Sequence, residues 1–396
     1  MLNDMTIGII GGGAMGAGIA QVLTTAGHPV RLLDQHAGAL EKAASGLEAN
    51  LRKLVEKGQF TPEAASAAAA RLSLTTFLPD FADCELVIEA VVEDLAVKQQ
   101  LFRDVERVVA PECILASNTS SLSLASIAAA CRRPERFIGL HFFNPAPLMQ
   151  LVEIIPAVQT RAGLADEVRA LVAGWGKLPV IAQDTPGFIV NRVARPFYGE
   201  AIRLLEEGIA DMATIDWALT ALGGFRMGPF ALMDFIGHDV NYRVTESVFA
   251  GFFFDPRYRP SITQKRLFEA GYFGRKSGRG FYDYAPGAPT PAPTQDETLG
   301  HLVFYRVLAM LINEAVDALA LGVASADDLE LAMTKGVNYP RGLLAWADAL
   351  GAARVLAWLD ALYDEYHEDR YRASPLLRKM ARTNQLFLPH ERLAPA

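Results

Sequence analysis

Met5 to Asp34 read MTIGIIGGGAMGAGIAQVLTTAGHPVRLLD. The apolar run Thr6–Ile10 predicts a first buried strand, and the helical pattern Ala14–Ala26 follows after a turn rich in glycine. Residues 11–16 of that turn, GGGAMG, fit the spacing GxGxxG, which is typical of a dinucleotide-binding turn between a strand and a helix.

The small residues of this turn have separate physical roles. Gly11 allows the tight turn, Gly13 lets the backbone approach a pyrophosphate, and Gly16 lets the helix pack closely on the strand. Ala14 and Met15 open the helix, whose free backbone N–H groups attract phosphate oxygens. We predict a nucleotide site here; the alternative is a tight turn that binds no ligand.

Asp34 ends the second expected strand and discriminates between cofactors. A carboxylate at this position accepts hydrogen bonds from both ribose hydroxyls of the adenosine and repels a 2′-phosphate. The sequence therefore predicts NAD as the cofactor in preference to NADP.

Short apolar runs continue to alternate with helical patterns through the first half of the chain. Further strands are expected at Val30–Asp34, Leu86–Glu89, Ile114–Ser117, Phe137–His141 and Val152–Ile155, and further helices at Ala37–Lys57 and Ala96–Val109. This order predicts an α/β domain of the Rossmann type, with a mostly parallel sheet, over residues 1–184.

After this domain, long helical patterns replace the β-branched runs, and they contain an internal repeat. In this repeat Glu200 aligns with Glu314, and Asp234 aligns with Asp348, at the same offset of 114 residues. We predict two all-α domains that look like a tandem duplication, at 185–284 and 299–396, joined by a proline-rich linker at 285–298. Two unrelated helical segments are the alternative.

Composition indicates a folded, globular protein. Of the 396 residues, 51% are hydrophobic and 21% charged, and the net charge of −8 argues against a nucleic-acid partner. Cys84, Cys113 and Cys131 show neither disulfide nor metal-site spacing, which predicts thiols in a reducing, cytoplasmic compartment. Charged residues interrupt the most apolar stretch, Leu302–Val323, so we expect a soluble helix there and no membrane span.

Three polar clusters lie where ligands of such a fold bind. Ser117–Ser121 (SNTSS) and His141–Pro145 (HFFNP) follow expected strands, and Pro186–Arg192 (PGFIVNR) opens the helical part. Open α/β sheets bind ligands at the carboxyl ends of their strands, so the first two clusters are expected to face the binding crevice.

The residue types in these clusters suit dehydrogenation of an alcohol. The hydroxyl proton needs a base, and neutral imidazole suits that role near pH 7, so His141 is the candidate. Glu153 can fix the imidazole tautomer, while Ser120 and Asn191 can hold substrate oxygens. A structural histidine, a solvated glutamate and a serine helix cap are the alternatives, and spacing does not separate them.

At these residues the sequence resembles the 3-hydroxyacyl-CoA dehydrogenase family. The resemblance extends from Met5 to Tyr284 and is carried by Gly11–Gly18, Ser117–Leu122, His141–Pro145, Leu151–Glu153, Asp184–Arg192 and Gly274–Tyr282. It implies that His141 is the catalytic base and Glu153 its partner, and that Ser120 and Asn191 contact the 3-oxygen of an acyl-CoA substrate. The implied NAD contacts are Asp34, Glu93, Lys98, Ser120, Asn144 and Lys276. Asn144 is also an implied substrate contact, and Lys57 matches a position that meets the CoA phosphates; a family serine near it is Asn50 here.

The duplicated tail resembles one branch of this family, the bacterial phenylacetate-pathway enzymes that oxidise 3-hydroxyadipyl-CoA. The residues concerned are Asn191–Pro196, Asp239–Asn241 and Val337–Pro340, although members of that branch usually have a longer insert before the second repeat. Arg195 follows Asn191 by one helical turn and is our candidate for gripping a terminal carboxylate, with Asn241 as a second donor. A surface position, or a pair with Glu200 or a neighbouring acid, is the alternative for Arg195.

Other functions and assemblies stay open at this point. A crystallin-like protein that binds NAD without turnover, and a β-hydroxyacid dehydrogenase with a catalytic lysine, compete with the acyl-CoA enzyme; fatty-acid β-oxidation is the other setting for that enzyme. Family members with one helical domain pair as homodimers, so the second repeat is expected to form either an intramolecular pseudo-dimer or part of a homodimer. Tyr305 occupies the position of Asn191 in that repeat, which predicts a structural copy without a second active site.

Overall fold

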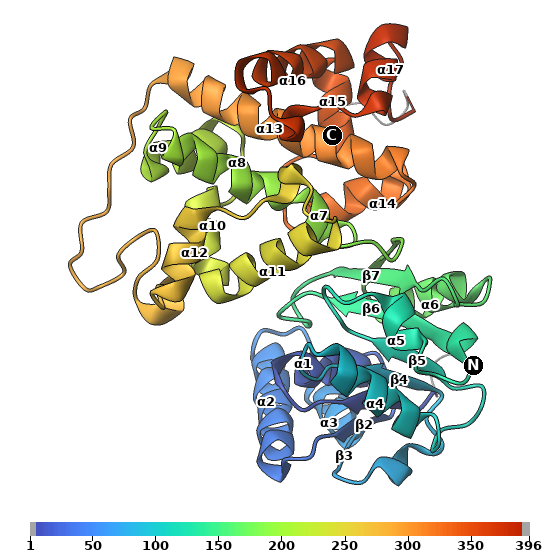
Figure 1. Cartoon of the computed structure of the whole chain (residues 1–396). Coiled ribbons are helices and arrows are strands. Elements are labelled where there is room, and N and C mark those ends of the chain that lie inside the picture. The colour runs from blue at the N-terminus through green and yellow to red at the C-terminus, as the bar shows by residue number, and fades with distance from the viewer. Residues whose placement is uncertain (1–4, 390–396) are drawn as a thin grey trace. The chain divides into compact units, whose positions relative to one another are not determined.

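The structure is a computed structural model that describes residues 5–389. The chain forms two compact units that divide after Thr185. The first unit contains the sheet, and the second is helical (Figure 1).

The sheet of the first unit confirms the predicted α/β fold class. Its strands are β1 (Ile7–Ile10), β2 (Val30–Leu33), β3 (Leu72–Thr75), β4 (Leu86–Glu89), β5 (Ile114–Ser117), β6 (Phe137–Phe142), β7 (Leu151–Pro156) and β8 (Leu178–Ile181). The order across the sheet is β3-β2-β1-β4-β5-β6-β7-β8. Neighbouring strands are parallel from β3 to β6, whereas β7 runs antiparallel to β6.

The two strands that the sequence analysis did not predict are those at the edges of the sheet. β3 (LSLT) has no buried residue, so its sequence lacks the apolar run that marks β1 or β4. β8 contains Pro179, which an edge strand tolerates because one side of its backbone needs no partner.

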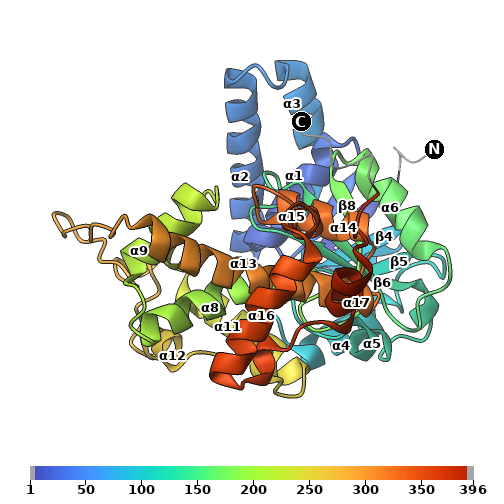
Figure 2. The ribbon, with the colours of Figure 1, turned by 90° about the horizontal axis from the view of Figure 1, so that it is seen from above.

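Helices pack on this sheet in the order that the alternation predicts. They are α1 (Ala14–Thr25), α2 (Ala37–Glu56), α3 (Pro62–Ala70), α4 (Leu95–Val105), α5 (Leu124–Ala128) and α6 (Leu164–Gly174). α1 is almost wholly apolar and contributes to the main core, whereas α2 buries only one stripe of residues. α2 and α3 form an antiparallel pair that extends away from the strands (Figure 2).

The second unit contains two copies of one helical pattern. The first copy comprises α7 (Val190–Val193), α8 (Arg195–Glu206), α9 (Met212–Trp217), α10 (Pro229–Ile236), α11 (His238–Gly251) and α12 (Ile262–Glu269). The second comprises α13 (Glu297–Ala320), α14 (Ala326–Leu331), α15 (Leu343–Leu350), α16 (Ala352–Tyr366) and α17 (Pro375–Thr383). Each copy has a π-helical turn, Ala218–Leu222 and Ala332–Gly336, at the predicted offset.

The copies also share their loop chemistry. Gly237 precedes α11 with φ +98° and ψ +136°, and Gly351 precedes α16 with φ +85° and ψ +125°. Asp234 accepts the backbone N–H groups of residues 281 and 282, and Asp348 accepts those of residues 387 and 388. This repetition of special backbone positions supports a duplication and argues against two unrelated helical segments.

Reciprocal buried ion pairs join the two copies. Arg192 of the first copy donates to Glu314 of the second over 2.6 Å, and Arg306 of the second donates to Glu200 of the first over 2.6 Å. Tyrosine hydroxyls at equivalent places, Tyr258 and Tyr371, donate to the same two glutamates. The two ion pairs are related as in an isologous contact, in which equivalent residues of the two partners make the same contact in both directions.

Glu314 is the centre of one of these clusters. Its burial disfavours the carboxylate, but the charges of Arg192 and Arg257 outweigh that effect and hold the pKa of Glu314 below its ordinary value. The cluster therefore stays ionised although it is removed from water.

The three cysteines lie in the interior of the sheet unit. Cys84, Cys113 and Cys131 are buried and form no disulfide, and burial raises the pKa of each thiol to about 12. Within residues 5–389, no helix combines the length and the apolar character needed to cross a bilayer.

Replacing Glu314 with glutamine should destabilise the helical unit strongly. The variant leaves Arg192 and Arg257 buried with one acid fewer, and breaking such a pair costs about 3–5 kcal/mol. The free energy of unfolding from urea titration measures the effect. Glu48→Gln is the control, because its exposed pair with Arg52 should change stability by less than about 0.5 kcal/mol. Similar small losses for both variants would contradict a structural role for the reciprocal pairs.

Candidate active site

The glycine-rich turn has the geometry that a nucleotide requires. Gly11 has φ +111°, and a Cβ there would lie 2.5 Å from the carbonyl oxygen of Ala90. A Cβ on Gly16 would lie 1.8 Å from the carbonyl oxygen of Gly11, so only glycine lets α1 start this close to β1. A Cβ on Gly13 would meet nothing within 4 Å, which leaves that backbone open to a ligand.

Asp34 follows β2 and is oriented by the same turn. Its Oδ2 accepts the N–H of Gly12 over 2.7 Å, and its Oδ1 accepts the N–H of His36 over 2.9 Å. Both bonds fix the carboxylate beside the N-terminus of α1, where Gly13 supplies no side-chain cap that would compete for the free N–H groups.

A cavity of about 790 Å³ opens beside Asp34 and the turn. Its walls are mainly apolar and come from β1, β2, α4 and the residues after β4. None of its lining residues is lysine or arginine, so this surface offers no cation to a 2′-phosphate. The open Gly13, the oriented carboxylate and the apolar cavity fit the phosphates, ribose and adenine of NAD.

His141 and Glu153 meet across the antiparallel pair at one side of the sheet. The register of β6 and β7 places them directly opposite each other, and His141 Nδ1 lies 2.6 Å from Glu153 Oε2. Both side chains are buried. A carboxylate on Nδ1 selects the tautomer in which Nε2 carries the lone pair, so Nε2 is the basic nitrogen.

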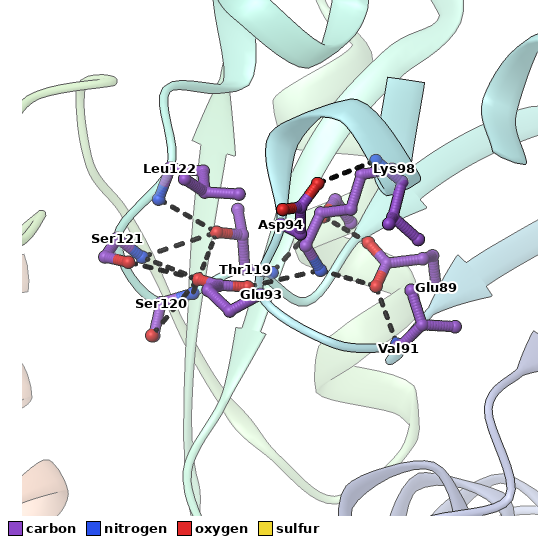
Figure 3. Close-up of polar contacts among 11 residues, drawn as sticks. Glu89, Val91, Glu93, Asp94, Lys98, Thr119, Ser120, Ser121 and Leu122 are labelled. Atoms are coloured by element: carbon purple, nitrogen blue, oxygen red, sulfur yellow. Dashed lines mark hydrogen bonds and ion pairs between the residues drawn. The ribbon is translucent and has the colours of Figure 1, made fainter. Parts of the chain in front are cut away.

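Glu93 connects the serine cluster to the rest of the site (Figure 3). Its Oε1 accepts the Thr119 hydroxyl over 2.6 Å and the Ser120 N–H over 2.9 Å. Burial raises the pKa of Glu93, but the charge of Lys98 and these hydrogen bonds outweigh burial and lower it below its ordinary value. An ionised Glu93 therefore holds the loop that carries Ser120.

Lys98 is buried beneath this loop, with 1% of its surface exposed. Its Nζ lies 2.5 Å from Glu89 Oε1 and 3.2 Å from Glu93 Oε2. Glu89, which ends β4, also accepts the Ser117 hydroxyl over 2.6 Å. The ammonium group is thus directed at two carboxylates, and this geometry favours an indirect role for Lys98, through Glu93, over direct contact with a cofactor.

Glu89 was not among the residues that the sequence analysis selected. The available signal was a carboxylate in an otherwise apolar strand (LVIE), because an acid in a buried strand needs a partner. Asn118 was missed as well; its Oδ1 accepts the N–H of Phe142 and ties the serine loop to β6.

A groove of about 670 Å³ runs along α1 and α2. Lys57 and Asn144 both line it, and so does Asn50, whose amide donates to Gln21 over 2.9 Å. Lys42 and Lys53 line it too, although the sequence analysis did not select them. The three lysines lie at spacings of 11 and 4 residues, which puts them on one side of a helix, and the lining contains no acid.

The remaining candidates belong to the second unit. Asn191 lies on α7, and Arg195 begins α8. Lys276 Nζ lies 2.5 Å from Asp239 Oδ1, and Asn241 is buried with its Oδ1 accepting from Gln264 over 2.8 Å.

The alternatives considered for Arg195 are a surface position and an ion pair with Glu200 or a neighbouring acid, and the described residues show neither. Its side chain is 7% exposed, so it is no surface residue. Glu200 is bonded to Arg306 and Tyr371 and forms no pair with Arg195 among the described residues.

Comparisons with known proteins agree with this geometry. Residues 6–185 match the family described as 3-hydroxyacyl-CoA dehydrogenase, NAD binding domain. Residues 187–284 and 302–390 both match 3-hydroxyacyl-CoA dehydrogenase, C-terminal domain, so the duplicated part matches in both copies.

Individual proteins similar to this chain have descriptions of the same family. The chain is 39% identical to the 3-hydroxyadipyl-CoA dehydrogenase of Escherichia coli (strain K12), over 96% of this chain and 98% of that protein. It is 44% identical to a probable 3-hydroxybutyryl-CoA dehydrogenase of Deinococcus radiodurans, over 71% of this chain and all of that protein. A crystal structure described as 3-hydroxybutyryl-CoA dehydrogenase from Escherichia coli K12 superposes with a TM-score of 0.91, at 38% identity over 96% of this chain and 98% of that one.

Asp34→Ala should weaken NAD binding and relax the rejection of NADP. The variant removes an acceptor for the ribose hydroxyls and a charge that opposes a 2′-phosphate, so we expect Kd for NAD to rise about tenfold. Titration calorimetry with both nucleotides measures this, and Glu41→Ala, an exposed acid on α2, is the control. Unchanged affinity and unchanged preference in Asp34→Ala would remove Asp34 from the cofactor site.

Glu93→Gln should loosen the serine loop. Glutamine has one acceptor oxygen where the carboxylate has two, and it removes one of the two charges that Lys98 contacts. We expect faster amide hydrogen exchange at Ser120 and a roughly tenfold or larger fall in kcat/KM. Glu112→Gln, an exposed glutamate, should change neither quantity. Normal exchange in Glu93→Gln would show that another group holds the loop.

Proposed function

From the premise that the chain belongs to the 3-hydroxyacyl-CoA dehydrogenase family and is an NAD-dependent enzyme, we propose a finer substrate. This substrate is a 3-hydroxyacyl-CoA with a terminal carboxylate, such as 3-hydroxyadipyl-CoA. The single observation that supports the chemistry most is the buried His141–Glu153 pair at 2.6 Å, in the same unit as a turn that fits NAD.

We propose that His141 removes the proton of the substrate's 3-hydroxyl through Nε2. Proton transfer and loss of hydride from C3 together convert the hydroxyl to a ketone; NAD, when bound, supplies the hydride acceptor. Glu153 accepts from Nδ1 and stabilises the imidazolium that forms. Because the pair is buried, water screens this attraction only weakly.

Ser120 and Asn191 would hold the 3-oxygen, as the family resemblance implies. Support for Ser120 comes from its loop, which Glu93 and Glu89 fix through Thr119 and Ser117. A donor that is already oriented loses little entropy when substrate binds, and this favours a defined position for the reacting oxygen.

The CoA moiety would lie in the groove along α1 and α2. Lys42, Lys53 and Lys57 offer three cations to its phosphates, and Asn50 stands where the family has a serine. The groove is open to solvent on α2, where all three lysines are exposed, and an exposed charge of this kind positions a phosphate more than it adds affinity.

The finer choice of substrate rests on the name of one full-length relative, while the crystal structure of the same coverage is described as a 3-hydroxybutyryl-CoA dehydrogenase. The Escherichia coli relative matched over nearly the whole chain, both repeats included, is a 3-hydroxyadipyl-CoA dehydrogenase. The Deinococcus relative aligns with only 71% of the chain and is a probable 3-hydroxybutyryl-CoA dehydrogenase. We therefore place the enzyme in the oxidation of dicarboxylic acyl-CoA, with plain fatty acyl-CoA as the alternative.

The second repeat would also replace a partner subunit. Its support is the reciprocal exchange of Arg192–Glu314 and Arg306–Glu200, which has the form of a two-fold interface within one chain. Tyr305, at the position of Asn191, cannot offer a donor amide, so this copy would have no second active site.

Formation of NADH from 3-hydroxyadipyl-CoA, 3-hydroxyhexanoyl-CoA and free 3-hydroxybutyrate tests the function directly. We expect turnover of the thioesters. NAD binding without turnover would support a crystallin-like protein, and faster turnover of the free acid would support a β-hydroxyacid dehydrogenase.

His141→Gln should lower kcat by about 10²- to 10⁴-fold, because general base catalysis contributes that much. Glu153→Gln should lower kcat less, since the imidazole stays while its charged partner is lost. NAD affinity should stay unchanged in both. His301→Gln, an exposed histidine on α13, is the matched control. Activity within about threefold of the original enzyme in His141→Gln would show that another residue is the base.

A further inference from the structure

One buried arginine of the helical unit differs from all its neighbours. Arg192, Arg306 and Arg370 are buried, and each contacts at least one carboxylate. Arg195 is equally buried, but no acid lies within ion-pair distance of it among residues 5–389. Its Nη1 donates to the Thr245 hydroxyl over 3.2 Å, and its Nε has no hydrogen-bond partner.

A second unsatisfied group lies near Arg195 and comes from the second repeat. Tyr339 is buried, and its hydroxyl has no hydrogen-bond partner among the described residues. Its ring lies 5.9 Å from that of Phe197, which follows Arg195 by two residues. Tyr198 completes the group, because the Arg195 guanidinium lies 5.0 Å from the centre of its ring.

These side chains influence one another's ionisation. Burial lowers the pKa of Arg195, and burial raises the pKa of Tyr198 and of Tyr339, while the positive charge of Arg195 acts in the opposite direction on both tyrosines. Arg195 contacts the Tyr198 ring, and Tyr339 packs on Phe197 of the same helix. All three side chains are buried and lack the negative charge that the other buried arginines have.

Such an arrangement is costly for the folded protein alone. A buried cation without a counter-ion loses hydration that the Thr245 hydroxyl and the Tyr198 ring replace only in part, and a buried hydroxyl without an acceptor loses its hydration as well. An arriving anion would satisfy both groups, since a guanidinium and a phenol are the donors that a carboxylate accepts.

We propose that Arg195 and Tyr339 form a carboxylate site, built from both helical repeats, that binds the distal carboxylate of the acyl chain. The proposal rests on the proposed function. The backbone from Val190 to Arg195 is right-handed helical, including Ala194 at φ −81° and ψ −8°. Asn191 and Arg195 are therefore one turn apart, with Cβ atoms about 5–6 Å from each other.

This spacing matches a six-carbon dicarboxylic chain. C3, whose oxygen Asn191 would hold, is three bonds from the distal carboxyl carbon, a distance of about 3.8 Å when extended, as between consecutive Cα atoms. Fatty acyl chains end in a methyl group and would leave both donors unsatisfied, so the site would discriminate against them.

Two variants separate this binding role from a structural one. Tyr339→Phe removes only the unpartnered hydroxyl and keeps the ring that packs on Phe197 and Phe225. Arg195→Leu removes the charge and keeps an apolar side chain. Tyr305→Phe is the control, because it removes a hydroxyl from the second repeat on α13, where the ring stacks on Trp358.

The first readout is the ratio of kcat/KM for 3-hydroxyadipyl-CoA to that for 3-hydroxyhexanoyl-CoA. We expect the ratio to fall about tenfold in Tyr339→Phe, about 100-fold in Arg195→Leu, and not at all in Tyr305→Phe. The second readout is Tm without ligand. Arg195→Leu should keep or raise Tm, because it removes a buried charge that the fold does not pair.

The outcomes that overturn the proposal are equally defined. Equal losses on both substrates, or a lower Tm with an unchanged ratio, would make Arg195 a structural residue. Calorimetric binding of adipyl-CoA and hexanoyl-CoA, which lack the 3-hydroxyl, tests the site without turnover. A chain that oxidises neither hydroxyacyl-CoA refutes the proposed function, whereas equal affinity of the original enzyme for these two thioesters refutes the carboxylate site alone.

Discussion

The reversal of strand direction at β7 is the constraint on which the proposed chemistry depends. β7 runs antiparallel to β6, so Glu153 lies directly opposite His141, 12 positions earlier in the chain. A slip of one residue would turn Glu153 to the other face of the sheet and leave the imidazole without its carboxylate. Both strands are buried along most of their length, so the apolar side chains around the pair fix this register.

Buried carboxylates organise the rest of the molecule in the same manner. In the sheet unit, Glu89 and Glu93 gather a lysine, four hydroxyls and three backbone N–H groups, and so shape the loop that carries Ser120. In the helical unit, Glu200 and Glu314 each collect an arginine and a tyrosine from the opposite repeat. Buried charges of this kind constrain the fold strongly, because an acid left unpaired in the interior would destabilise it. They therefore favour the one packing arrangement in which every acid has its partner.

The sequence predicts the parts of this structure that depend on local pattern. The glycine turn, six of the eight strands and the offset of 114 residues follow from periodicity and from residues with special backbone needs. Edge strands escaped prediction because an exposed strand such as LSLT has no apolar run. The roles of Glu89 and Asn118 escaped it because they depend on partners far away in the chain, Ser117 and Phe142, and spacing along the sequence does not reveal such contacts.

Duplication within one chain has a consequence for how this protein can change. In a homodimer every substitution occurs on both sides of the symmetry axis, so a residue that improves one pocket is imposed on the equivalent place in the other subunit. Here the two copies are encoded separately, and Phe225 faces its own counterpart, Tyr339, at a ring distance of 4.9 Å. One copy has phenylalanine at this position and the other has tyrosine. The single polypeptide can therefore evolve an asymmetric pocket, with each half specialised, which identical subunits related by a two-fold axis cannot do.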